Sequence, residues 1–105
     1  MQGVEWYRGR PILYSLGNLL MRMHRDHPWT ELGYLARVEL SRGGLPVVEV
    51  CPFRVHGVDV LPLAGEPAYE RLFFHHLEAI SRPLGGTAIA APDADGCARL
   101  APPGA

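Results

Sequence analysis

Two short strand-forming runs separated by only two residues constrain the fold of this chain most strongly. Val4–Tyr7 and Arg10–Ser15 are rich in residues that favour strands, and Arg8-Gly9 lies between them. A two-residue loop with glycine in its second position is typical of a tight hairpin turn, because such turns need a positive φ. Pro11 has no N–H to donate, so it must stand where the ladder needs no such bond. These residues predict a β-hairpin.

A second hairpin is expected farther along the chain. Apolar and polar residues alternate from Tyr34 to Ser41, which is the period of a strand with one buried face. Arg42-Gly43-Gly44 then indicates a turn, and "LPVVEVCPFRV" reads as a second long strand. That strand carries apolar residues on both faces, as a strand covered on both sides would. The segment between the two hairpins reads as a long loop.

An amphipathic helix is predicted over Pro67–Ser81. Pro67 suits the first helical turn, where a missing N–H costs nothing, and Pro83 marks the end of the helix. Helical spacing places six residues on one stripe: Tyr69, Leu72, Phe73, His76, Leu77 and Ile80.

The predicted elements make one small domain, residues 1–82, followed by a tail, residues 83–105. The tail is rich in Ala, Pro and Gly with little periodicity, and it is expected to be mobile. Two hairpins and one helix make a thin α+β core that would be marginal alone. The strand with two apolar faces in the second hairpin therefore indicates that a further layer belongs against it.

Composition excludes several function classes. The formal net charge is −1, so the excess of positive charge needed by a general nucleic-acid or anionic-membrane binder is missing. No run approaches the about 18 apolar residues of a membrane span, and no basic-then-apolar leader begins at Met1. Cys51 lies in a strand pattern and Cys97 in the tail, which predicts one buried and one exposed free thiol.

The first eighteen residues carry a resemblance to a known family. Gln2-Gly3-Val4-Glu5, Tyr7-Arg8-Gly9, Pro11-Ile12 and Tyr14-Ser15-Leu16-Gly17-Asn18 together resemble the signature of the CapA-type bacterial proteins of poly-γ-glutamate and capsule biosynthesis. The later strands and the helix are similar in order and pattern up to about residue 82.

This resemblance implies a four-layer α/β/β/α sandwich, the calcineurin-like metallophosphoesterase fold. It also implies a divalent metal pair in the full-length family, held by Asp, Asn and His ligands that include a Gly-His-x-x-His-type motif directly before the matched segment. Those motifs have no counterpart here. The chain is thus expected to be the C-terminal part of a family member, inactive by itself and without a cofactor of its own. Family members are often membrane-associated or exported, but this sequence assigns no compartment.

By the same resemblance, Ser15, Gly17 and Asn18 would lie on the rim of the metal site. The alternative is a structural turn in which Asn18 bonds its own backbone. Arg8, beside the hairpin turn, could meet a phosphate or a polyanion such as polyglutamate. Its alternative is a solvated surface arginine.

Other candidate ligands are weaker. "HRDHP" places His24, Asp26 and His27 within four residues, but its spacing is not that of a usual zinc site and a solvated loop is favoured. His75 and His76 are adjacent on the predicted helix and point about 100° apart, so they cannot easily chelate one ion. No nucleophile–base pair or phosphate-binding loop is recognisable, so no catalytic residue is assigned.

Two functions follow as alternatives. The first is the C-terminal portion of a CapA-like protein, whose partner would be the upstream part of the same domain and whose ligand could be polyglutamate. The second is a stand-alone interaction module that self-associates through exposed strand edges. Neither involves nucleic acid.

Overall fold

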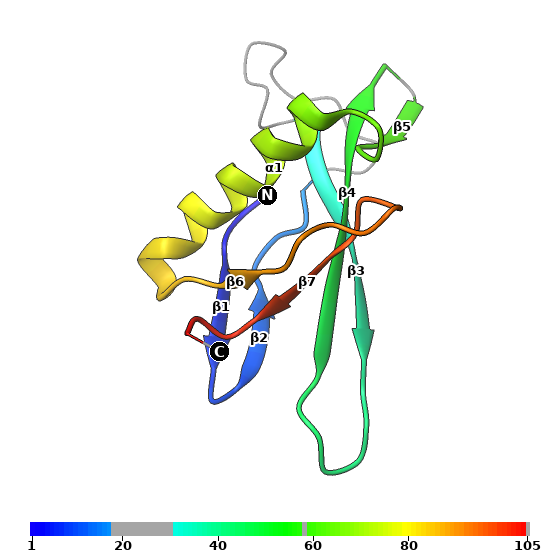
Figure 1. Ribbon diagram of the computed structural model, residues 1–105. Coiled ribbons are helices and arrows are strands. Elements are labelled where there is room, and N and C mark those ends of the chain that lie inside the picture. Colours follow the sequence, from blue (N-terminus) through cyan, green and yellow to red (C-terminus); the bar gives the residue numbers. More distant parts are fainter. Residues whose placement is uncertain (18–30, 58, 105) are drawn as a thin grey trace.

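The computed structural model describes residues 1–17, 31–57 and 59–104, and shows a small α+β fold with two sheets and one α-helix (Figure 1). The elements in chain order are β1 (Val4–Tyr7), β2 (Arg10–Leu13), β3 (Leu32–Glu39), β4 (Val47–His56), β5 (Asp59–Pro62), α1 (Pro67–Ser81), the 3₁₀ turn η2 (Arg82–Leu84), β6 (Ala88–Ile89) and β7 (Ala98–Ala101). Within these ranges no helix has the length and apolar character to cross a membrane.

The first predicted hairpin is confirmed. β1 and β2 pair antiparallel, and the connecting residues Arg8 and Gly9 have φ of 53° and 76°. Two positive φ angles define the turn type that matches the right-handed twist of paired strands. Tyr7 and Arg10 close the turn, so the next pair, Trp6 and Pro11, takes the position without ladder bonds. Proline is tolerated there because no N–H is required.

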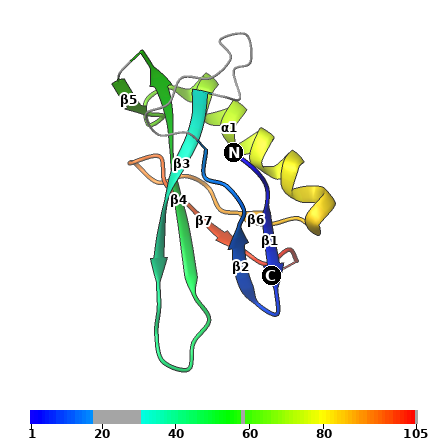
Figure 2. The ribbon, with the colours of Figure 1, turned by 180° about the vertical axis from the view of Figure 1, so that it is seen from behind.

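The second predicted hairpin is also confirmed, as part of a five-stranded sheet. The strand order is β3-β4-β7-β6, and β5 pairs with the C-terminal end of β4. β3 pairs antiparallel with β4 along the whole of β3, from Leu32 opposite Arg54 to Glu39 opposite Val47. Their hairpin extends past the other elements in both views (Figures 1 and 2).

The C-terminal segment differs from the expected tail. Residues 83–105 contribute β6 and β7, and β7 pairs with β4 through Val48 opposite Leu100 and Val50 opposite Ala98. A hydrogen bond from Ala90 N to Arg99 O joins the two ends of this segment. Strands of two and four residues show too little periodicity to be recognised in a sequence. They form here because β4 offers a partner to β7, and β7 in turn pairs with β6.

The predicted helix has the bounds that the sequence indicated, with Pro67 in its first turn. Its fully buried residues are Phe73, Leu77 and Ser81, and His76 is half-buried beside them. Tyr69, expected on the buried stripe, is partly exposed and lies under the guanidinium of Arg54, 4.7 Å from the ring centre.

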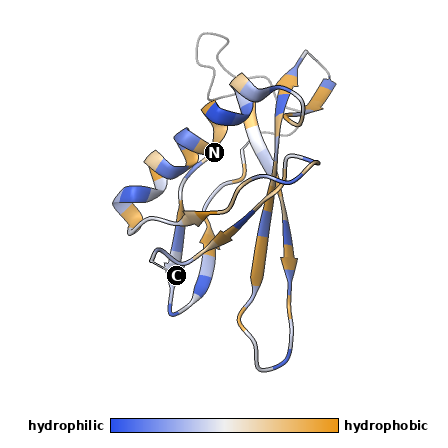
Figure 3. Cartoon of the chain, in the orientation of Figure 1, coloured by the Kyte–Doolittle hydropathy of each residue, from blue (hydrophilic) through white to orange (hydrophobic). Residues whose placement is uncertain are grey.

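The core lies between α1 and the two sheets. Figure 3 shows the apolar residues that β4 contributes along its length. The buried cluster consists of Val4, Leu32, Tyr34, Val48, Val50, Leu63, Phe73, Leu77 and Leu100. One buried polar group joins the helix to the first hairpin, because Ser81 Oγ accepts a hydrogen bond of 2.9 Å from Val4 N–H. A second link runs from Trp6 Nε1 to Thr87 Oγ1 at 2.9 Å, where the hairpin lies beside β6 and β7.

Candidate functional site

Residues 14–17, called the crossing below, lead from the end of β2 to the side of β3. Ser15 O accepts a hydrogen bond from Gln2 N–H, and Leu16 O accepts one from Tyr34 N–H, both of 3.0 Å. Ser15 Oγ accepts a longer bond of 3.4 Å from Gly17 N–H. The backbone of this crossing therefore connects β1 to β3, and it holds the predicted rim residues Ser15 and Gly17 at one end of β2.

Steric crowding explains why the crossing has glycine at position 17. Gly17 has a φ of +96°, and a Cβ on it would lie 2.9 Å from both Gly33 Cα and Leu32 O. A side chain would thus meet backbone on the neighbouring strand, besides being in an unfavourable conformation. Gly33 shows the reciprocal approach, since its Cβ would lie 2.9 Å from Leu16 O. A glycine on each side allows the two backbones to touch.

Among the remaining predicted rim residues, the structure describes only Arg8. Arg8 lies in the β1–β2 turn, at the opposite end of β2 from Ser15, and its guanidinium is 5.2 Å from the centre of the Tyr7 ring. It is not brought together with Ser15 and Gly17. The other candidates, Asn18, His24, Asp26 and His27, lie outside the described residues.

Two titratable side chains near the N-terminus have shifted pKa values. A hydrogen bond from Tyr14 Oη to the Glu5 carboxylate raises the pKa of Tyr14. Burial lowers the pKa of His76, and the positive N-terminus and His75 lower it further. His75 is exposed and His76 half-buried, as the helical spacing predicted.

The cysteines overturn the prediction of two free thiols. Cys51 and Cys97 form a disulfide, with Cα atoms 4.1 Å apart. Because Val50 is paired with Ala98, the β4–β7 register brings the two cysteines directly opposite each other. The prediction failed because it gave no strand to the segment that contains Cys97.

The same place holds the one group of three potential ligand side chains found in the described parts of the chain. Atoms of Glu49, Cys51 and Cys97 lie within 4.8 Å of one another. Both sulfurs are engaged in the disulfide, so only the Glu49 carboxylate could bind an ion, and it is paired with Arg37 at 3.3 Å. This donor set does not fit a pair of hard divalent cations, which need several oxygen or imidazole ligands.

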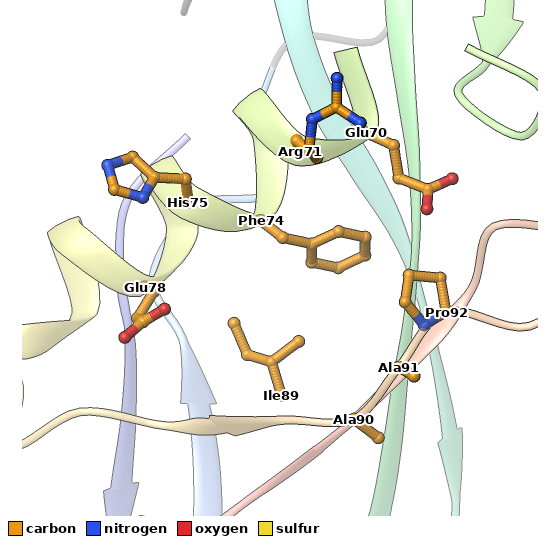
Figure 4. A pocket seen from close by; sticks show the side chains of 9 residues that line it. All are labelled: Glu70, Arg71, Phe74, His75, Glu78, Ile89, Ala90, Ala91 and Pro92. Atoms are coloured by element: carbon orange, nitrogen blue, oxygen red, sulfur yellow. The ribbon is translucent and has the colours of Figure 1, made fainter. Parts of the chain in front are cut away.

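Sequence reasoning also missed a groove between α1 and the segment after η2. The groove has a volume of about 520 Å³ and is lined by Glu70, Arg71, Phe74, His75, Glu78, Ile89, Ala90, Ala91 and Pro92. Figure 4 shows the apolar Phe74 and Ile89 between the acidic Glu70 and Glu78. The lining holds no serine, threonine or cysteine nucleophile. The groove exists because the C-terminal strands bring residues 89–92 beside α1, so no local sequence pattern predicts it.

Tyr34, which lies next to the crossing, should make the free energy of unfolding depend on pH. Its ring is 1% exposed, its hydroxyl has no hydrogen-bond partner among the described residues, and burial raises its pKa to about 12. The unfolded chain releases this proton near pH 10 and the folded chain only near pH 12, so stability is full below pH 10 and falls above it. We expect a loss of at most about 3 kcal/mol between these values.

The measurement is the free energy of unfolding in urea from pH 8 to 11, for the natural chain and for Tyr34→Phe. The variant should lose less stability than the natural chain as the pH rises. Parallel pH profiles for the two proteins would contradict the expected role of Tyr34.

Comparison of the sequence with protein-family models and with curated proteins gave no match.

Proposed function

We propose that this chain is the C-terminal part of a CapA-type protein of poly-γ-glutamate or capsule biosynthesis, with the metallophosphoesterase sandwich as the fold of the whole. The observation that carries the proposal is the structural role of the glycines in the "QGVEWYRGRPILYSLGN" segment. A Cβ on Gly3 would lie 2.4 Å from Ile80 O, Gly9 and Gly17 have positive φ, and Gly17 also touches β3. The motif thus has glycine where a side chain would be strained or would clash.

The arrangement of the sheets also supports the proposal. β1 and β2 form a two-stranded sheet of their own, and a two-stranded sheet is marginal unless other elements pack on it. In the proposed whole protein these strands belong to the second sheet of the sandwich, α1 closes it, and the Ser15–Gly17 crossing forms one rim of the cleft.

Metal-dependent hydrolysis would belong to the whole protein. The side chains of the described residues do not offer a ligand set for the implied metal pair, so no catalytic step is assigned to them. Their contribution would be to hold the crossing rigidly, through the bonds from Gln2 and Tyr34 to its carbonyl groups.

The test begins with the coding sequence upstream of Met1. We expect an open frame that encodes Gly-His-x-x-His and earlier Asp motifs. The extended protein should hydrolyse bis(p-nitrophenyl) phosphate with Mn²⁺, whereas the present chain should not. In the extended protein, Asn18→Ala should lower kcat by at least about tenfold, and Arg42→Ala, in the turn of the β3–β4 hairpin, should leave it unchanged.

The proposal fails if the upstream frame is closed or lacks these motifs. It also fails if the extended protein carries the motifs but Asn18→Ala behaves like Arg42→Ala.

A further inference from the structure

Beyond Tyr34, the outer edge of β3 has no strand paired to it in the described parts of the chain. β3 ends the order of the five-stranded sheet, with β4 on its inner side. Tyr34 N–H points to the outer side, because it donates to Leu16 O. Backbone groups alternate in direction along a strand, so Ala36 and Val38 direct their N–H and C=O to the same outer edge. Within the described ranges no strand pairs there, and such an edge is a template for another strand.

Apolar side chains continue along this edge beyond the core. Val38 is 47% exposed, and Leu40, directly after β3, is 77% exposed. Both lie on the face of the sheet that carries the buried Tyr34 and Val48. A second strand on the edge would extend this apolar face and cover part of both side chains.

The opposite face carries a row of alternating charges that ends at the same edge. Arg99, Glu49 and Arg37 are register neighbours on β7, β4 and β3. Arg37 Nη1 lies 3.3 Å from Glu49 Oε1, and the Arg37 side chain is exposed. The row therefore ends in a positive charge, and a strand that continued it would best supply an acidic residue at that position.

We propose that the chain forms a two-fold dimer in which β3 pairs antiparallel with β3 of a second copy, with Val38 opposite Val38. This register places Arg37 opposite Glu39 twice, once on each side of the axis. Each Glu39 then continues the charged row of the other copy. Ala36 faces Leu40, so the exposed apolar side chains meet on the other face. The facing Val38 residues direct their backbone groups toward each other and exchange two hydrogen bonds.

A second register would also satisfy the backbone hydrogen bonds, but it matches the side chains less well. With Ala36 opposite Ala36, Arg37 would face Leu35, and Glu39 would face Gly33. Opposite charges directly across a strand pair stabilise it, whereas a charge facing an apolar residue gains nothing. The chain carries its own complementary pair two residues apart, which selects the register centred on Val38. This inference does not depend on the proposed function, because it uses only the edge of β3.

Charge reversal tests the register. Sedimentation equilibrium should show a dimer of the natural chain. Arg37→Glu should raise the dimer Kd at least about tenfold, because two attractive pairs become repulsive. The double variant with Arg37→Glu and Glu39→Arg should return the Kd to within about threefold of the natural value. Arg10→Glu on β2 makes the same charge change away from the interface and should leave the Kd unaltered.

A backbone variant tests the strand pairing. Val38→Pro removes an N–H that faces outward, so no β3–β4 bond is lost and an edge position can accept proline. It should be monomeric with a circular dichroism spectrum like that of the natural chain, whereas Val38→Thr should remain dimeric. The proposal is overturned by a monomeric natural chain, by a dimeric Val38→Pro, or by equal Kd values for Arg37→Glu and Arg10→Glu. Failure of the double variant to recover would overturn the register.

Discussion

Reduction of the Cys51–Cys97 disulfide is expected to lower the free energy of unfolding by about 4 kcal/mol. The bond closes a loop over a sequence separation of 46, and a cross-link over such a loop removes much entropy from the unfolded chain. A domain of this size has only about 5–15 kcal/mol in total. The loss should appear in urea unfolding curves recorded with and without a dithiol reductant.

The double variant with Cys51→Ala and Cys97→Ala is the control. It should match the reduced natural chain and should not respond to the reductant. Hydrogen exchange should show where the loss falls, because β7 is held to β4 by three register pairs next to the disulfide. Amides of Ala98 and Leu100 should exchange faster after reduction. Two titratable thiols in the unreduced, urea-unfolded chain would contradict the assignment.

Gly3→Ala is expected to cost about 3 kcal/mol, which is large for the addition of one methyl group. The new Cβ would lie 2.4 Å from Ile80 O and 3.0 Å from Leu84 Cδ1. The first contact is with backbone at the end of α1, so the helix and β1 must separate. That movement would also strain the buried bond from Val4 N–H to Ser81 Oγ. Urea unfolding at neutral pH measures the cost.

Gly43→Ala is the matched control. Gly43 has a φ of +71°, and a Cβ on it would have no atom within 4 Å. The control therefore isolates the backbone strain, expected to be about 1 kcal/mol. If Gly3→Ala costs no more than Gly43→Ala, the close approach of β1 to α1 does not constrain the fold. The structural explanation of the first glycine in the proposed family motif would then be lost.

The predicted hairpins and helix show how far local patterns reach. The Arg8-Gly9 loop reflects a tight turn, the alternation after Tyr34 reflects the two-residue repeat of a strand, and the stripe around Phe73 reflects the repeat of a helix. Each repeat is set by the backbone geometry of one segment, so it is visible in the sequence even though the side chains of Tyr34 and Phe73 meet across the fold. The glycine of the crossing was equally visible as a turn signal at residue 17, although the sequence could not show what it approaches.

Other features had no local signal. The short strand β7 depends on β4 for pairing, β6 depends on β7, and the disulfide depends on the β4–β7 register. The groove beside α1 follows from the same segment, since Ile89 and Pro92 form one of its walls. The rim itself stays a prediction; the structure adds only that Arg8 and Ser15, which belong to the same sequence motif, lie at opposite ends of β2.

The amino-acid sequence by itself determined the elements whose partners lie next to them: the two hairpins, with their turns, and the helix from Pro67 to Ser81. Only the tertiary structure decided which distant segments meet. It paired Cys51 with Cys97, placed Gly17 against Gly33 and, in the part of the chain that the structure describes, set no strand against the outer edge of β3. The physical reason is that local geometry repeats along the chain and leaves a period. A long-range contact depends instead on the register of a sheet, which no single segment contains.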